Sequence, residues 1–216
     1  MDPQSTALVV VDMVRSHLDM DIGHLPLAPE DAKRVLKNVA ETVIPVFRKH
    51  GRPIIFIQTY NRIDHGRNGT FAMANPFWNY QMENSSVPGV GRKRTSKAVE
   101  GSPVIELMPP LEAGPQDYIV VKRRYSPFLN TDMESIIQVL GLKSLVVVGI
   151  NTNNCVLCTS FEAFNRDLEV IVAEDCCASM NGSEYHDAAI MIIKTALGWV
   201  IGSEQIDGIL SGRESL

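Results

Sequence analysis

Short apolar runs alternate with stretches of helical periodicity along most of the chain. Six runs rich in valine, isoleucine and other large apolar residues have the length of buried strands, and they lie at residues 7–11, 53–59, 118–122, 145–150, 168–173 and 199–201. Runs without a polar face are typical of a parallel sheet that is covered by helices on both sides. The alternation of strands and helices therefore predicts an α/β fold arranged as a three-layer α/β/α sandwich.

Apolar residues at three- and four-residue spacing predict the helices between these strands. They are expected at residues 32–47, 132–140, 155–166, 183–197 and 204–210. The first of them has Pro29 placed for its first turn and Gly51 for its C-terminal cap. Pro45 lies inside its pattern and has no backbone N–H, so we expect this helix to kink, or to end and restart.

A long stretch at about residues 60–116 breaks the rhythm of strands and helices. It is rich in proline and glycine, and connections of this length are usually functional lids or disordered segments. Its aromatic residues Phe71, Phe77, Trp78 and Tyr80 favour an ordered flap over a site. We predict a single domain over residues 1–216 that carries this stretch as a flap or insert.

Composition and charge exclude several classes of protein. Apolar residues make up 45% and charged residues 21% of the 216-residue chain, which is typical of globular proteins and excludes wholesale disorder. The net charge of −5 argues against nucleic acid as a partner. The apolar runs are too short to span a membrane, and the N-terminus has no signal-peptide pattern. Four cysteines do not make a secreted disulfide framework, so we expect a cytoplasmic protein.

Three residues with complementary chemistry lie at the ends of predicted strands. Asp12 ends the first strand, Lys122 ends the third, and Cys155 follows the fourth. Singly, each has an ordinary structural explanation: a helix cap, a solvated lysine and a small buried side chain. Ligands of parallel α/β sheets bind at the carboxyl ends of the strands, so the three together indicate one catalytic site.

An acid, a cation and a thiol at one site favour nucleophilic catalysis. An isolated thiol has a pKa of about 8.5, and we expect Lys122 and a helix N-terminus to lower the pKa of Cys155 to about 3.5–7.5. Asp12 would accept the thiol proton and return it to a leaving nitrogen. Backbone N–H groups at and just before Cys155 would hold the oxyanion, and water would hydrolyse the resulting thioester.

The same residues carry a resemblance to a known family. Asp12 after an apolar strand, Lys122 in the stretch VKRRYSPF and Cys155 in GINTNNCV closely resemble the isochorismatase-like cysteine hydrolases, over residues 7 to about 210. The resemblance implies that Asp12, Lys122 and Cys155 form the catalytic triad and that the sheet is six-stranded and parallel. It also implies a cis peptide between Ile150 and Asn151, which would turn the Asn151 amide into the oxyanion hole.

Within this family, the chain is most similar to the amidohydrolases. It keeps a cysteine at position 155, where isochorismate hydrolases usually have a non-nucleophilic residue. The stretch from Lys122 to Phe128 is similar to ureidoacrylate and carbamoyl amidohydrolases, which implies a small amide or ureide substrate. We predict that Arg124, Tyr125 and Trp78 contact this substrate. Residues 59–65 contain one histidine and no second ligand of the nicotinamidase type, so we predict neither a metal nor another cofactor.

Several alternatives stay open at this point. The protein could be an isochorismatase-type or nicotinamidase-type hydrolase, a redox protein that uses Cys155 and Cys158, or a binding protein with a vestigial triad. His186 and Asp187 could form a Cys–His hydrolase with Cys155, but at the start of a helix we expect them to face solvent. The resemblance also implies a homodimer or homotetramer.

Overall fold

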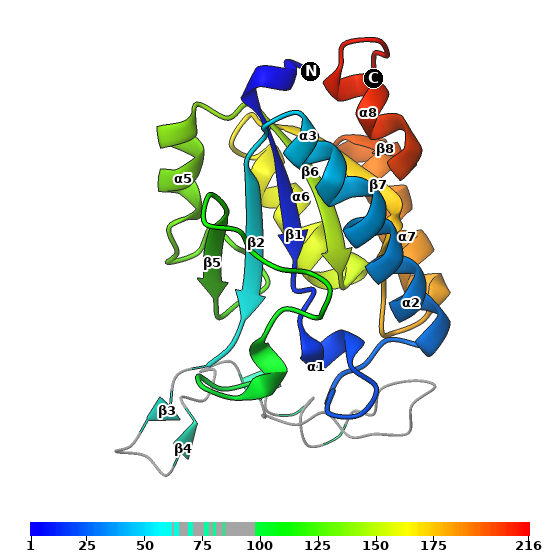
Figure 1. The fold of residues 1–216 in the computed structure, drawn as a ribbon. Helices are drawn as coiled ribbons and strands as arrows, with labels where there is room; N and C mark the ends of the chain where they lie inside the picture. Colours follow the sequence, from blue (N-terminus) through cyan, green and yellow to red (C-terminus); the bar gives the residue numbers. More distant parts are fainter. Residues whose placement is uncertain (62, 65–68, 71–75, 78–79, 81–83, 85–97) are drawn as a thin grey trace.

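The computed structural model describes residues 1–61, 63–64, 69–70, 76–77, 80, 84 and 98–216. Six strands form one sheet in the order β5-β2-β1-β6-β7-β8, and every neighbouring pair is parallel. The strands are β1 (Thr6–Val11), β2 (Ile54–Thr59), β5 (Tyr118–Lys122), β6 (Ser144–Ile150), β7 (Glu169–Ala178) and β8 (Trp199–Ile201). The predicted six-stranded parallel sheet is confirmed, and β1, β2, β5 and β6 all point downward in Figure 1.

Helices cover both faces of the sheet and complete a three-layer sandwich (Figure 1). One layer holds α2 (Pro29–Asn38), α3 (Ile44–Lys49) and α8 (Ile206–Leu210), and the other holds α5 (Met133–Leu140), α6 (Leu157–Phe164) and α7 (Ser183–Ala196). The strands are apolar on both faces because each face packs on a core. In β1, for example, Leu8 and Val10 face the first layer, and Val9 faces the second.

The helix that contains Pro45 neither breaks nor restarts. Between α2 and α3 the chain makes a π-helical turn over Val39–Val43, and the Ile44 N–H donates to the Val39 carbonyl. Pro45 then occupies the first turn of α3. A proline ring has no N–H and crowds the carbonyl four residues earlier, so a wider turn just before it lets the helix continue.

Strand β7 is longer than predicted. The apolar run ends at Ala173, but the strand continues to Ala178. Its register against β6 shifts between Val147 and Gly149, where an irregularity takes up extra residues of β7. The charged pair Glu174 and Asp175 interrupts the apolar pattern without ending the strand, which is why the run alone predicts too early an end.

The end of the predicted flap is tied to the segment that follows β1. Leu107 forms an antiparallel bridge with Val14, and the Met108 N–H donates to the Met13 carbonyl at 3.0 Å. The bridge brings residues 106–108 beside the short helix α1 (Arg15–Leu18). Residues 106–108 are therefore an integral part of the fold next to the carboxyl edge of the sheet.

Other short elements complete the described residues. Strands β3 (Ile63–Asp64) and β4 (Gly69–Thr70) pair antiparallel, and 3₁₀ turns lie at Pro3–Ser5, Pro103–Ile105 and Ser203–Gln205. Among the flap aromatics, Phe77 and Tyr80 are exposed and stack with ring centroids 6.0 Å apart. Phe71 and Trp78 lie outside the described residues. No helix in the described part of the chain is long and apolar enough to cross a membrane.

Candidate active site

The structure brings Asp12, Lys122 and Cys155 together at the carboxyl edge of the sheet. Asp12 directly follows β1, Lys122 is the last residue of β5, and Cys155 lies in the helical turn after β6. The Lys122 Nζ atom lies 2.8 Å from Asp12 Oδ2 and donates to Cys155 Sγ at 3.1 Å. All three side chains are buried, Lys122 completely, so a cation bridges a carboxylate and a sulfur away from bulk water.

The backbone and one further side chain fix the carboxylate of Asp12. Its residue has a left-handed φ of 51°, and its N–H donates to the Ile57 carbonyl at 3.0 Å. The Thr59 hydroxyl donates to Asp12 Oδ1 at 2.7 Å, while Oδ2 faces Lys122. Both carboxylate oxygens are thus engaged. The sequence pattern does not single out Thr59, because its position beside Lys122 depends on the β2–β5 register.

Gly149 lets the two central strands approach each other beside the site. It lies opposite Val11 in the β1–β6 register and has a φ of 116°. A Cβ atom at this position would lie 2.2 Å from the Val11 carbonyl oxygen, which is far inside van der Waals contact. Glycine is therefore required here, and the close approach sets the spacing between Asp12, after β1, and Cys155, after β6.

Cys155 lies in the first turn of a helical segment that begins at the end of β6. A π-helical turn spans Thr152–Val156 and leads directly into α6. The carbonyl of Asn151 accepts hydrogen bonds from the N–H groups of Asn154 and Val156, both at 3.1 Å. The peptide bond between Ile150 and Asn151 is cis, and both residues are buried. Ile150 thus ends β6, and Asn151 and Cys155 follow it within one turn.

The segment after β7 holds this turn from the other side. Asn151 Oδ1 accepts the Met180 N–H at 2.8 Å, and Asn153 Oδ1 accepts the Ser179 hydroxyl at 2.7 Å. These two bonds tie the residues just before Cys155 to a neighbouring strand end. The position of Cys155 is therefore set by side chains more than twenty residues further along the chain.

The expectation that His186 faces solvent is wrong. Its side chain is only 14% exposed, and its Nδ1 atom lies 2.8 Å from the hydroxyl of the fully buried Thr152. Burial lowers the pKa of His186 below its ordinary value, and the charge of Glu174 opposes that shift. Asp187 is exposed, as predicted. His186 packs inward because the start of α7 lies against the turn that carries Cys155.

The electrostatics of the triad correct the prediction for the thiol. Burial by itself lowers the pKa of Lys122, but the charge of Asp12 and the contact with Cys155 raise it above its ordinary value. Burial raises the pKa of the Cys155 thiol, and the charge of Asp12 raises it further, against the opposing effect of Lys122. The predicted lowering of the Cys155 pKa is wrong because Asp12 already neutralises Lys122, so a second anion would be buried without a counter-charge.

The predicted substrate-contacting residues lie in different surroundings. Lys122 Nζ donates to the carbonyl of Arg124 at 3.1 Å, so the Arg124 backbone reaches the triad. The Arg124 guanidinium donates to the Arg123 carbonyl at 2.7 Å. Tyr125 is 38% exposed, and Trp78 lies outside the described residues.

The remaining cysteines and histidines give no sign of a metal centre in the described part of the chain. All four cysteines are free thiols, and Cys158 is half-buried on α6. Among the described residues, no three His, Cys, Asp or Glu side chains gather in a metal-binding group. His65, the histidine weighed as a ligand in the sequence, lies outside them.

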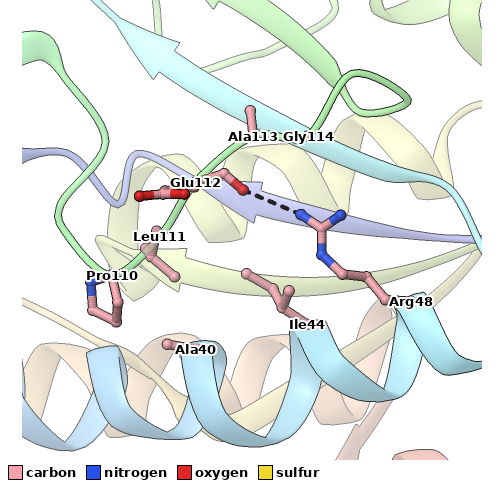
Figure 2. Close-up of a pocket in the computed structure, with 8 residues that line it drawn as sticks. All are labelled: Ala40, Ile44, Arg48, Pro110, Leu111, Glu112, Ala113 and Gly114. Carbon is pink, nitrogen blue, oxygen red and sulfur yellow. Dashed lines mark hydrogen bonds between the residues drawn. The ribbon is translucent and has the colours of Figure 1, made fainter.

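A separate pocket of about 380 Å³ lies on the α2–α3 side of the sheet (Figure 2). In Figure 2, the segment from Pro110 to Gly114 faces this helical layer, and the Arg48 guanidinium donates to the Glu112 carbonyl at 3.1 Å. The pocket is lined by Ala40, Ile44, Arg48, Pro110, Leu111, Glu112, Ala113 and Gly114. No triad residue is among them, so this pocket is distinct from the buried cluster.

Comparison with known proteins agrees with the geometry of the site. The family model described as the isochorismatase domain matches residues 6–205. The chain belongs to the isochorismatase family. This isochorismatase-family chain is 32% identical over 206 residues to the ureidoacrylate amidohydrolase RutB of Acinetobacter baylyi, an alignment that covers 92% of this chain and 80% of that one. The family resemblance predicted from the sequence is confirmed.

Solved structures share the fold of this isochorismatase-family chain. A cysteine hydrolase from Pseudomonas syringae pv. phaseolicola 1448A superposes with a TM-score of 0.81 at 19% identity, over 99% of this chain and 96% of that one. N-carbamoylsarcosine amidase from Thermoplasma acidophilum superposes with a TM-score of 0.69 at 23% identity, over 94% and 98% of the two chains. Both likenesses extend over nearly the whole chain.

Proposed function

We propose that this protein is a cysteine hydrolase that cleaves the C–N bond of a small amide or ureide through a thioester intermediate. The observation that carries the proposal is the contact of Lys122 Nζ with both Cys155 Sγ and the Asp12 carboxylate in a buried cluster. Membership in the isochorismatase family and the similarity to a ureidoacrylate amidohydrolase support the reaction class. Cys155 is the nucleophile, Asp12 the proton carrier and Lys122 the fixed cation.

The first step follows from the charges of the cluster. Lys122 supplies one positive charge, and the buried site stabilises one negative charge beside it. At rest that charge lies on Asp12, because the raised pKa of Cys155 keeps the thiol protonated. Transfer of the thiol proton to Asp12 moves the negative charge to sulfur and leaves the net charge unchanged. The thiolate then forms as substrate arrives, instead of being present at rest.

The bonds made and broken then balance without another reagent. The Sγ electron pair forms a C–S bond, and the carbonyl π pair moves to oxygen, where the backbone N–H groups of Asn151 and Cys155 receive the oxyanion. When the tetrahedral intermediate collapses, the C–N bond breaks and Asp12 returns its proton to the leaving nitrogen. Asp12 next takes a proton from water, the hydroxide attacks the thioester, and sulfur leaves and regains that proton.

The substrate class follows from the same chemistry. A small planar amide or ureide presents one carbonyl to the sulfur and one nitrogen to Asp12. We propose that Arg124, Tyr125 and Trp78 contact the substrate, with hydrogen bonds from Arg124 and Tyr125 to a carboxylate or urea oxygen. We propose a metal-independent reaction without a cofactor, because three side chains, two backbone amides and water account for every proton and electron pair.

We also propose one domain over residues 1–216, a homodimer or homotetramer, and a cytoplasmic location. Large apolar side chains on α7 and β8 stay exposed in the single chain and support self-association: Tyr185, Met191, Ile192 and Trp199. The four free cysteines support a reducing compartment. Light scattering on the purified protein measures the number of subunits.

The test of the function is a screen for released ammonia or amine. Linear amides, ureides and cyclic amides, including nicotinamide, are offered to the chelator-treated wild type, to Cys155→Ser and to the matched control Cys158→Ser. We expect turnover of a linear amide or ureide by the wild type and by Cys158→Ser, and a loss of at least about 10⁴-fold in Cys155→Ser. Mass spectrometry of the quenched reaction should show an acyl group on Cys155.

Three results would contradict the proposal. Turnover by Cys155→Ser equal to that of the wild type would reject the nucleophile. Loss of turnover on chelation, with recovery on adding a metal, would favour the nicotinamidase type. A reversible disulfide between Cys155 and Cys158 in the absence of any hydrolysis would favour the redox protein.

A further inference from the structure

The turn that carries Cys155 is held by three consecutive side chains. Asn151, Thr152 and Asn153 each place a side-chain oxygen against residues 179–186, which we call the anchor segment. At the start of the anchor segment, the Met180 N–H donates to Asn151 and the Ser179 hydroxyl donates to Asn153. At its end, His186 contacts the hydroxyl of Thr152. Only the last contact joins the turn to a side chain on a different helix, α7.

The contact between Thr152 and His186 joins two side chains that are largely removed from water. The Thr152 side chain is fully buried, so a hydroxyl left without a partner would be costly. His186 Nδ1 lies 2.8 Å from that hydroxyl. The other ring nitrogen, Nε2, is 4.0 Å from Glu174 Oε1 on β7. The imidazole is therefore oriented between the buried turn and a carboxylate on the neighbouring strand.

We propose that His186 is a positioning residue for the reaction, which acts through Thr152 to fix the turn that bears the nucleophile and the oxyanion-binding amides. The inference rests on the proposed function and assigns His186 no proton transfer and no contact with substrate. It differs from a Cys–His mechanism, because the partner of Cys155 is Lys122 and the partner of His186 is Thr152.

The expected kinetic effect follows from where the turn acts. The Asn151 and Cys155 amides bind the oxyanion, which exists in the transition state and not in the bound substrate. A variant that lacks the contact between Thr152 and His186 should therefore have a lower kcat and a nearly unchanged KM. A merely structural role would lower the melting temperature without this separation between kcat and KM.

The test compares variants that keep or remove the two hydrogen-bonding atoms. His186→Leu should lower kcat about 10- to 100-fold with KM within about 3-fold of the wild type. His186→Asn, whose amide takes the place of Nδ1, should recover most of that loss. Thr152→Val should behave like His186→Leu, and Thr152→Ser should behave like the wild type.

The double variant His186→Leu/Thr152→Val should be no worse than the poorer single variant. Glu184→Gln, exposed in the same turn of α7, is the matched control and should match the wild type.

A second readout separates this inference from the proposed function. The rate of alkylation of Cys155 by iodoacetamide, followed by peptide mass, needs no substrate and reports the surroundings of the sulfur. His186→Leu and Thr152→Val should each slow alkylation of Cys155 about 5-fold and leave that of Cys158 unchanged. This result would support the positioning role even if no amide were turned over. If His186→Leu does not fold, the Thr152→Val and Thr152→Ser pair decides alone.

Two outcomes would overturn the inference. In the first, kcat and the alkylation rate stay at wild-type values in folded His186→Leu and Thr152→Val. In the second, His186→Asn is as impaired as His186→Leu and the effects of the two sites add in the double variant, so that no specific bond couples them.

Discussion

Two lysine–carboxylate pairs lie at opposite ends of the sheet, and the distance from nitrogen to oxygen is the same in both. At the carboxyl edge Lys122 Nζ is 2.8 Å from Asp12, and near the other edge, where α3 and α8 meet in Figure 1, Lys49 Nζ is 2.8 Å from Asp207. The side chains of the first pair are 0% and 2% exposed, and those of the second are 63% and 30% exposed. Distance is matched between the two sites, and burial differs.

Burial decides what each pair does. At the exposed site, hydrogen bonds from Lys49 and His50 lower the pKa of Asp207 to about 2, and water accommodates every charge. At the buried site, removal from water raises the pKa of Cys155 and restricts the cluster to one anion beside Lys122. The same contact is an ordinary surface ion pair at the exposed site, and at the buried site it is the pair that we propose to take part in proton transfer.

The largest expected effect comes from removing the carboxylate of the buried pair. Asp12→Asn should lower kcat about 10²- to 10⁴-fold, because it removes the proton acceptor. It should also destabilise the protein by about 3–5 kcal/mol, because Lys122 is left buried without its counter-charge. Urea unfolding measures this cost, with Asp207→Asn as the matched variant. Equal losses of stability at the two sites would contradict the role given to burial.

The next effect concerns the approach of the strands beside the buried site. Gly149→Ala should destabilise the protein by about 3 kcal/mol and lower kcat at least about 10-fold, because its Cβ would meet the Val11 carbonyl. Gly141 also has a positive φ, but nothing lies within 4 Å of its Cβ position, so Gly141→Ala should cost only about 1 kcal/mol. The comparison separates the steric clash of the Cβ atom from the cost of a positive φ. Similar costs for both variants would show that backbone conformation alone sets the requirement.

A smaller effect is expected from substitution of Thr59, the uncharged hydrogen-bond partner of Asp12. Thr59→Val removes the hydroxyl that donates to Oδ1 and should lower kcat about 10-fold, with little change in stability. Thr59→Ser keeps the hydroxyl and should retain activity within about 3-fold of the wild type. Steady-state kinetics of the two variants check this. If serine and valine have the same effect, packing of the threonine methyl group, and not the hydrogen bond, orients Asp12.

The smallest effect should come from the exposed pair, and it should depend on pH. The pKa of Asp207 is lowered from 3.8 to about 2, so its ionised form stabilises the native state above pH 3.8, and this contribution is lost as the pH falls through about 2. Asp207→Asn should lower the melting temperature by at most about 3 °C at pH 7. Calorimetry should show the difference from the wild type narrowing between pH 4 and pH 2. A difference that grows on acidification would have the wrong sign.

Much of the fold was predictable because buried strands appear in the sequence as continuous apolar runs. The apolar runs located all six strands of the sheet, since a strand that packs on both faces has few polar positions. They also placed Asp12, Lys122 and Cys155 at strand ends, where a parallel sheet gathers them. The run at residues 168–173 ended too early, because it gave no sign that Glu174 and Asp175 continue β7 through an irregular region.

The features that the sequence did not reveal all depend on contacts between distant segments. Thr59 is an ordinary strand residue until the register sets it beside Lys122, and Gly149 is one glycine among fifteen until Val11 lies opposite. The start of a helix predicts an exposed His186, because the local sequence gives no sign of what packs on it. The pKa of Cys155 is raised and not lowered, because burial and the charge of Asp12 outweigh the effect of Lys122.

The distribution of the triad over three separate strands has a consequence for synthesis of the protein. Asp12 and Lys122 leave the ribosome first, and the sulfur comes only at residue 155. Until that point, the growing chain has no Cys155 to join the cluster. During synthesis the cluster is therefore assembled only after the strands that hold Asp12 and Lys122 have both been made.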